Sequence, residues 1–203
     1  MNYIETHPAR VFALLGQHVQ LVALALVVAF VVALPLGILT ARSTRGSGAI
    51  LGTLGAIYTI PSLALLALLV QAVGLGPLPI FIALVAYAQF MLVRNIVTGL
   101  HEVDPAIRDA AMGLGMSKNQ SLLRVELPLA FPVILGGIRV AAVAMVALAT
   151  LGGYVGAGGL GTLIFTGLAL HHTDQILAGS ILASALAIAI DLSLRGCERL
   201  VSS

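Results

Sequence analysis

Of the 203 residues of this chain, 60% are hydrophobic and only 9% are charged, and the mean hydropathy is +1.10. A water-soluble domain needs far more polar surface, so this composition excludes one and predicts an integral membrane protein. The net charge of +2 gives little support to a nucleic-acid partner, and the single cysteine, Cys197, is expected to be a reduced cytoplasmic thiol.

Long apolar runs predict an all-α membrane protein with five transmembrane helices in a single domain, 1–203. The spans cover about 19–39, 49–73, 78–97, 132–151 and 175–194. Helices are expected because backbone groups in lipid must bond within their own segment. The first run is expected to be retained rather than cleaved, because it is long and no cleavage site follows it. Before it, residues 8–16 either form a separate amphipathic helix on the outer surface or extend the span.

The basic residues indicate the orientation of the chain in the membrane. Arg42 and Arg45 follow the first span, five basic residues lie in or beside the segment between spans three and four, and Arg195 and Arg199 follow the last span. Cytoplasmic loops carry an excess of lysine and arginine. Nine of the ten basic residues, all except Arg10, therefore predict an outer N-terminus and a cytoplasmic C-terminus.

Residues 101–128, between the third and fourth spans, form the one long polar stretch. Asp104 followed by Pro105 is typical of a helix start, with a capping side chain and a proline that needs no N–H donor there. The helix that begins at this point is expected to end near Gly113 to Gly115, because glycine favours helix termination.

A second short helix is expected in the same segment. Ser117 and Gln120 have the spacing of a capping box, in which each side chain bonds the other residue's free backbone N–H. The helix should run from Lys118 to Leu127, and Pro128 should stop it.

Three interpretations of this helical pair were weighed: packing under the spans, reading of DNA, and docking of another protein. Its two tethers to the bilayer and its acidic residues argue against a DNA-reading helix-turn-helix. A face of small residues argues for docking, because it lets a partner approach the backbone closely. That face consists of Ala106, Ala110, Ala111 and Gly113.

The segment also resembles a known signature. It follows the pattern E-A-A-x-x-x-G-x(9)-I-x-L-P of permease subunits in ATP-binding-cassette importers. The matching residues are Asp109-Ala110-Ala111, then Gly115, nine residues, Val125, one residue and Leu127-Pro128. The two departures, aspartate for glutamate and valine for isoleucine, are conservative. In that family the segment is the coupling helix, which sits in a cleft of a cytoplasmic ATPase. The resemblance implies ATPase-coupling roles for Arg108, Asp109, Ala110, Ala111, Gly115 and Ser117.

Four longer stretches, 60–69, 103–116, 122–141 and 156–161, are similar to the subgroup that imports osmoprotectant quaternary amines such as glycine betaine, choline or carnitine. The implied partners are two ATPase subunits that bind ATP and magnesium, an extracytoplasmic binding protein, and a second permease copy or a paralogue, in a bacterial or archaeal inner membrane. This chain itself is expected to hold no cofactor or metal and to be no enzyme. Two alternatives remain: the same machinery for an amino acid, a betaine-like thiol or a phosphonate, and a non-transporting membrane scaffold.

The energy source is expected to lie outside the chain. The centres of the predicted spans carry no ionisable residue, which argues against a proton- or sodium-driven transporter, and no Walker A sequence is present. Five spans make a thin wall for a solute path, so two copies related by a twofold axis are expected. Small residues at Gly48, Gly52, Gly55, Gly136, Gly137 and Ala141 allow close helix contacts, either between copies or within one.

Polar and aromatic residues in mid-span positions are the candidates for the solute path. They are Tyr58, Thr59, Ser62, Tyr87, Gln89, Thr150 and Tyr154. With no tryptophan and few other aromatic residues in the chain, tight recognition of a quaternary ammonium is expected in the binding protein instead. For His171, His172 and Asp174, a solvated outer loop is favoured over a metal site, because a fourth ligand and a supporting set are lacking.

Gly156, Gly158 and Gly161 have the G-x-G-x-x-G spacing of a dinucleotide loop. Such a loop needs a preceding strand, whereas these glycines follow a membrane helix, so the match is treated as a coincidence. Two interpretations stay open for residues 156–161, called the glycine loop below. One is a loose outer turn. The other, implied by the resemblance, is a re-entrant outer gate formed by Gly156, Gly158, Gly159 and Gly161.

Overall fold

The computed structural model describes residues 2–43 and 46–201, and the regular structure in them is entirely helical. Four stretches are long and apolar enough to cross a membrane, and a bent helix pair is a fifth candidate. The four are α2 (Pro8–Arg42), α5 (Pro77–Glu102), Lys118–Val155 and α10 (Thr173–Val201); the pair is α3 (Ser47–Thr59) and α4 (Ser62–Val73). The predicted all-α class is therefore confirmed for the described residues. Arg45, one of the basic residues used to predict the orientation, lies outside them.

The centre of the bundle is α5, which packs between α2 and α8 (Leu127–Ala149) through small residues. On α2 the packing face repeats every four residues and consists of Ala25, Ala29, Ala33 and Gly37. A Cβ on Gly37 would lie 2.6 Å from Ile96, and one on Gly137 of α8 would overlap Asn95. Small residues at such spacing let helix backbones approach closely, so Gly137 serves packing within the chain.

Residues 8–16 belong to α2, so the expectation of a separate surface helix is wrong and the extension of the first span is confirmed. No helix-breaking signal separates residue 16 from the apolar run, and even Pro35 lies inside the continuous helix. A five-residue helix, α1 (Asn2–Thr6), precedes α2.

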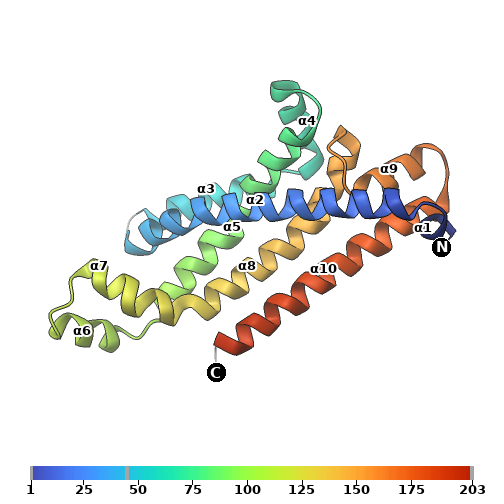
Figure 1. Cartoon of the computed structure of the whole chain (residues 1–203). Helices are drawn as coiled ribbons and strands as arrows, with labels where there is room; N and C mark the ends of the chain where they lie inside the picture. Colours follow the sequence, from blue (N-terminus) through green and yellow to red (C-terminus); the bar gives the residue numbers. More distant parts are fainter. Residues whose placement is uncertain (1, 44–45, 202–203) are drawn as a thin grey trace.

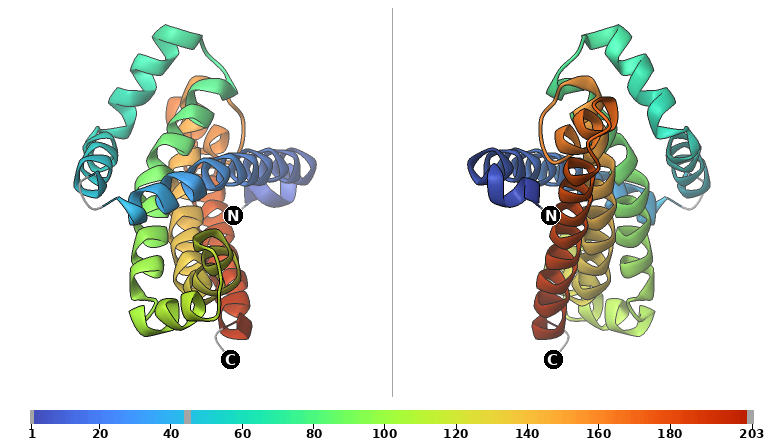
Figure 2. Two further views of the ribbon diagram at one scale, coloured as in Figure 1. Left: turned by 90° about the vertical axis from the view of Figure 1, so that its left-hand side faces the viewer. Right: turned by 90° about the vertical axis from the view of Figure 1, so that its right-hand side faces the viewer.

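The second predicted span is not one straight helix. Its two parts, α3 and α4, meet at a 90° bend at Ile60 and Pro61. Ile60 takes extended dihedrals, φ −62° and ψ 129°, because the ring of a following proline disfavours the helical conformation. Figure 2 shows α3 and α4 standing away from the rest of the bundle, and α3 buries none of its residues in the single chain.

Between α5 and α8 lie α6 (Pro105–Gly113), α7 (Lys118–Ser121) and a π-helix, η1 (Leu122–Glu126). The predicted Asp104 cap and the capping box are both confirmed. The predicted stop at Pro128 is wrong, because α7, η1 and α8 form one continuous stretch. The wider π-turn bonds the N–H of Leu127 to the carbonyl of Leu122, which accommodates a proline that has no N–H of its own.

The opposite end of the bundle holds the glycine loop. A 3-10 helix, η2 (Thr150–Val155), leads into it, and α9 (Gly161–Ala169) follows and packs against both η2 and α10. In Figure 1 this region lies beside the N-terminus, at the end opposite α6 and α7. The segment is thus a turn, as one of the two interpretations expects, but it is packed rather than loose.

Candidate functional site

The helix α6 presents an exposed surface at one end of the molecule (Figure 1). Its small residues Ala106, Ala110 and Gly113 are exposed together with Asp109, whereas Ala111 faces inward and is buried. Three large apolar side chains extend this surface: Ile107, Met112 and Leu114, the last with an exposed fraction of 82%. Exposed apolar patches occur at contact sites with other proteins or with the membrane.

Arg108, which the resemblance groups with the docking residues, makes its polar contacts within its own hairpin. Its guanidinium donates to the carbonyl of Leu100 at the end of α5 and lies 3.5 Å from the Glu126 carboxylate on η1. Ser121 donates to the other oxygen of Glu126 at 3.2 Å. Arg108 therefore joins α6 to the segment that continues into α8.

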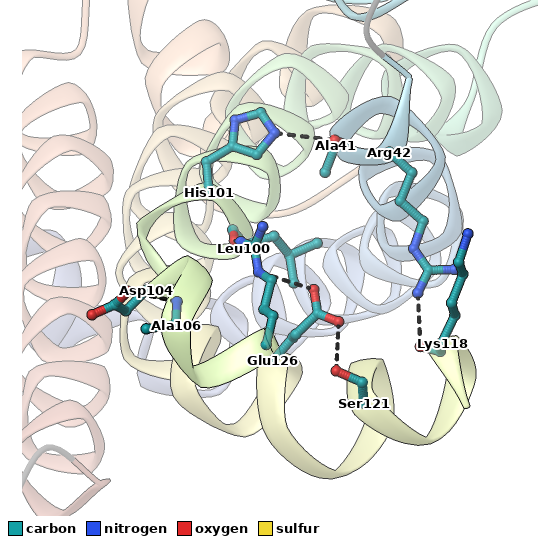
Figure 3. A network of polar contacts seen from close by, with 10 residues as sticks. Ala41, Arg42, Leu100, His101, Asp104, Ala106, Lys118, Ser121 and Glu126 are labelled. Carbon is teal, nitrogen blue, oxygen red and sulfur yellow. Dashed lines mark hydrogen bonds and ion pairs between the residues drawn. The ribbon is translucent and has the colours of Figure 1, made fainter. Parts of the chain in front are cut away.

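The turn after α6 is held by its own backbone and caps. Gly115 has φ +85°, a left-handed conformation that a residue with a Cβ rarely adopts. Ser117 is exposed, accepts from the Gln120 N–H and so starts α7. Arg42 at the end of α2 donates to the carbonyl of Lys118, which ties the turn to the first span (Figure 3). Arg42 and Lys118 also line a cavity of about 420 Å³.

We expect Glu126→Gln to lower the free energy of unfolding by about 1–2 kcal/mol, because the ion pair with Arg108 is partly buried. The measurement is the unfolding transition of the purified protein in detergent. Glu102→Gln is the matched control, since Glu102 is exposed at the end of α5 and its replacement should change stability by less than about 0.5 kcal/mol. Equal effects of both variants would contradict a linking role for Glu126.

At the other end, three residues of the glycine loop need glycine for conformational reasons. Gly156, Gly158 and Gly159 have φ of 76°, 82° and 75°, in the left-handed region. With these dihedrals the chain turns sharply after η2 and returns to begin α9. The glycine density that the sequence shows is thus explained by the shape of the turn.

Gly161, the fourth predicted gate residue, is glycine for lack of space. A Cβ there would overlap the carbonyl oxygen of Thr150, and a Cβ on Gly153 would overlap the backbone of Gly161. The backbones of η2 and α9 are therefore in direct contact. Gly153 was missed by the sequence analysis, because only the fold brings it against Gly161.

Two polar residues of α2 hold the glycine loop, and neither was predicted. The Oε1 atom of Gln17 accepts from the N–H of Gly159 at 3.1 Å, and Nδ1 of His18 accepts from the N–H of Leu160 at 3.3 Å. His18 is fully buried, and its Nε2 lies 3.1 Å from the carbonyl of Val146 on α8. These contacts define a neutral imidazole that accepts at Nδ1 and donates at Nε2. His18 thus joins α2, α8 and the loop.

Some of the predicted path residues meet at the bend between α3 and α4. The rings of Tyr58 and Tyr87 are 6.0 Å apart in an edge-on arrangement, and Tyr87 donates to the carbonyl of Ile60 at 2.6 Å. Ser62 is half-buried at the start of α4, and Thr59 donates to a carbonyl of its own helix. Phe90 completes an aromatic cluster by stacking on Tyr58 at 5.3 Å. The sequence analysis missed it because an apolar ring in a span carries no distinguishing signal.

The remaining predicted path residues lie elsewhere. Gln89 is buried and donates to the carbonyl of Ala29, so it faces α2 rather than the bend. Thr150 donates to the carbonyl of Ala147 in the last turn of α8. Tyr154 is 68% exposed on η2, with its ring 5.6 Å from that of Phe165. Within the described residues, no group of His, Cys, Asp and Glu side chains that could hold a metal ion is found.

Solved structures show which class of protein has this arrangement. A chain of the MetNI methionine ABC transporter, solved in inward-facing conformations, superposes with a TM-score of 0.88 at 20% identity, covering 97% of this chain and 98% of that one. A chain of an amino acid ABC transporter crystallised with histidines gives 0.74 at 18% identity, covering 98% and 95%. The fold is that of an ABC importer permease.

The chain belongs to the family described as the binding-protein-dependent transport system inner membrane component, whose model matches residues 33–202. It is thus a multi-pass membrane subunit of a transporter complex, in which ATP hydrolysis and substrate capture lie in partner proteins.

Curated relatives match over nearly the whole chain. The glycine betaine/carnitine/choline transport system permease protein OpuCB of Bacillus subtilis is 35% identical over 100% of this chain and 93% of its own length. The carnitine transport permease protein OpuCB of Listeria monocytogenes is 40% identical over 90% and 84%. The osmoprotectant import permease protein OsmW of Salmonella typhimurium is 36% identical over 94% and 91%.

Proposed function

We propose that this chain is the permease subunit that passes a quaternary-amine osmoprotectant of the glycine betaine, choline or carnitine type through the membrane. The observation that carries the proposal is the similarity, over nearly the full length, to permeases named for these solutes. An extracytoplasmic binding protein delivers the solute. The complex lies in a bacterial or archaeal inner membrane.

The N-terminus lies outside and the C-terminus in the cytoplasm. Arg42, Arg108 and Lys118 all line the cavity at the α6 end of the bundle, as the excess of basic residues in cytoplasmic loops would place them. The glycine loop then lies at the outer end. There it forms the outer gate, with its glycines allowing the backbone to bend and separate.

Two cytoplasmic ATPase subunits, which bind ATP and magnesium, drive the cycle through α6. Asp109, Ala110 and Gly115 lie on its exposed part, and Leu114 projects beside them. A side chain as apolar and exposed as Leu114 at a cytoplasmic surface fits the cleft of another protein. Arg108 and Ala111 shape the hairpin from inside, and Ser117 caps α7.

The solute path runs between two permease copies, identical or paralogous. Two observations support this. No residue of α3 is buried in the single chain, and a Cβ on Gly48 or Gly52 would meet no atom within 4 Å. A second copy would cover this face, because small residues permit close helix contact in lipid. Tyr58, Ser62, Tyr87 and Tyr154 then border the path.

The proposal is tested by ATP-dependent uptake in liposomes that contain the whole complex and its binding protein. Labelled glycine betaine, choline and carnitine are offered, with amino acids as the competing class. Uptake of at least one quaternary amine, and of no amino acid, is the expected result. Uptake of amino acids alone would contradict the proposed substrate, and no uptake of any solute would favour a membrane scaffold.

Leu114→Asp is expected to abolish this uptake while leaving the chain folded, because it places a charge in the contact with the ATPase. Both co-purification of the ATPase and uptake are measured. Leu114→Met, which keeps an apolar side chain of similar volume, is the control and should retain most of the uptake. Normal uptake by the aspartate variant would show that α6 docks through other residues.

A further inference from the structure

An arginine lies about two helical turns before the cytoplasmic end of α5. Arg94 is on α5, seven residues before His101, whose ring contacts the carbonyl of Ala41 at the cytoplasmic end of α2 at 3.1 Å. Seven helical residues correspond to about 10 Å along the axis. Arg94 therefore lies about 10 Å further from the cytoplasm than the polar contacts in Figure 3, and its side chain is exposed on the single chain.

The side chain points along α5 toward Phe90. Its Cζ atom lies 5.9 Å from the ring centroid of Phe90, which is one turn nearer the outer end of α5. Helical side chains point toward the N-terminus of their helix, and here that is the outer end. Among the described residues, Arg94 forms no ion pair with a carboxylate. A charge at this depth with no carboxylate partner among the described residues marks a functional position.

Beside Arg94 stands the aromatic cluster, which consists of Tyr58, Tyr87 and Phe90. Tyr58 stacks on Phe90 with 29° between the ring planes, stands edge-on to Tyr87, and is 38% exposed. The cluster adjoins the bend between α3 and α4, where Ile60 and Pro61 are exposed. Non-helical backbone at membrane depth has to line a cavity or be covered by protein.

The chemistry of this corner matches a zwitterion. A guanidinium binds a carboxylate through charge-assisted hydrogen bonds. Aromatic faces attract a quaternary ammonium, and the C-terminal end of α3, with its partial negative charge, also favours a cation. Glycine betaine and carnitine carry both groups, whereas choline carries a quaternary ammonium and no carboxylate.

We propose that Tyr58, Phe90 and Arg94 form a transit site inside the membrane for zwitterionic quaternary amines, with Arg94 holding the carboxylate. The proposal deepens the proposed function and rests on it. It makes Arg94 a determinant of selectivity in the permease step, separate from the selectivity of the binding protein. A cargo with no carboxylate leaves the arginine unpaired and brings two cations close together, which is unfavourable.

The test measures KM and kcat for uptake of glycine betaine, carnitine and choline by the complete complex in liposomes. Arg94→Gln is expected to lower kcat/KM for the two zwitterions by about tenfold or more, and to leave choline uptake unchanged or raised. Arg94→Lys keeps the charge and should recover most of the zwitterion uptake. Because every variant is assayed with the same binding protein, the selectivity of that protein cancels in the comparison.

Arg10→Gln is the matched control, because Arg10 is an exposed arginine near the outer end of α2. It should change no rate. Phe90→Leu and Tyr58→Leu should lower uptake of all three solutes, since all carry the quaternary ammonium, while Tyr58→Phe keeps the ring and should retain uptake.

Equal losses for all three solutes in Arg94→Gln would overturn the transit site and show that Arg94 serves the fold or the coupling. Wild-type uptake of choline alone would also overturn it, while the proposed function would stand. If the wild-type complex carries no quaternary amine at all, both the proposed function and the transit site fail.

Discussion

Gly161→Ala is expected to abolish uptake. The added Cβ would overlap the carbonyl oxygen of Thr150, which belongs to the backbone and cannot turn aside as a flexible side chain does. Relief of the overlap requires α9 to move away from η2, which breaks the packing of Leu163, a fully buried residue of α9. We expect a loss of stability of about 3 kcal/mol or more. The measurements are the yield of monodisperse protein, its unfolding transition and its uptake activity.

The control is Gly16→Ala, in the helical part of α2. No heavy atom lies within 4 Å of the position that its Cβ would take, and alanine is the better helix former. This variant should keep full uptake and gain about 0.5–1 kcal/mol of stability. Wild-type stability and uptake in Gly161→Ala would show that η2 and α9 separate easily and that their contact is not part of the gate.

The two variants illustrate what the sequence predicts about glycine and what it does not. The density of glycine at 156–161 indicates a turn that other residues would not form, and the structure confirms such a turn. The spacing does not tell a residue with positive φ, such as Gly158, from one that lacks room for a side chain, such as Gly161. That distinction depends on η2, which reaches Gly161 only in the folded chain.

The hairpin that contains α6 was predicted more fully, because its signals are local. The caps at Asp104 and Ser117 depend on residues two or three positions away, and both form as the sequence predicts. The predicted helix stop at Pro128 is wrong because the π-turn before it depends on contacts outside the local sequence. In η1, Glu126 is fixed by Arg108 and Ser121, two contacts that no helix propensity describes.

The sequence contains a local signal for the bend in the second span. A proline disfavours the helical conformation of the residue before it, and Ile60 precedes Pro61. However, Pro35 lies within the continuous helix α2, so a proline alone does not locate a break. Packing distinguishes Pro35 from Pro61. The helix α2 packs along α5 at Ala33 and Gly37, whereas α3 has no buried residue that would keep it in line with α4.

His18→Ala should have the second large effect. Nothing in the sequence distinguishes His18, a polar residue beside a long apolar run, yet it bonds two other parts of the chain from a fully buried position. Alanine leaves the N–H of Leu160 without its acceptor and opens a cavity between α2, α8 and the glycine loop. We expect a loss of about 3–5 kcal/mol, measured from the unfolding transition, together with the loss of uptake.

Two partial replacements separate the two contacts of His18. His18→Asn offers an oxygen near the position of Nδ1 and can keep the bond from Leu160, whereas His18→Gln offers an amide N–H near Nε2 and can keep the bond to Val146. If holding the loop is what matters for transport, the asparagine variant retains more uptake than the glutamine variant at similar stability. The reverse order would show that the contact between α2 and α8 is the important one. Gln17→Ala removes a single bond to Gly159 from a more exposed position, so its cost should stay near 1 kcal/mol.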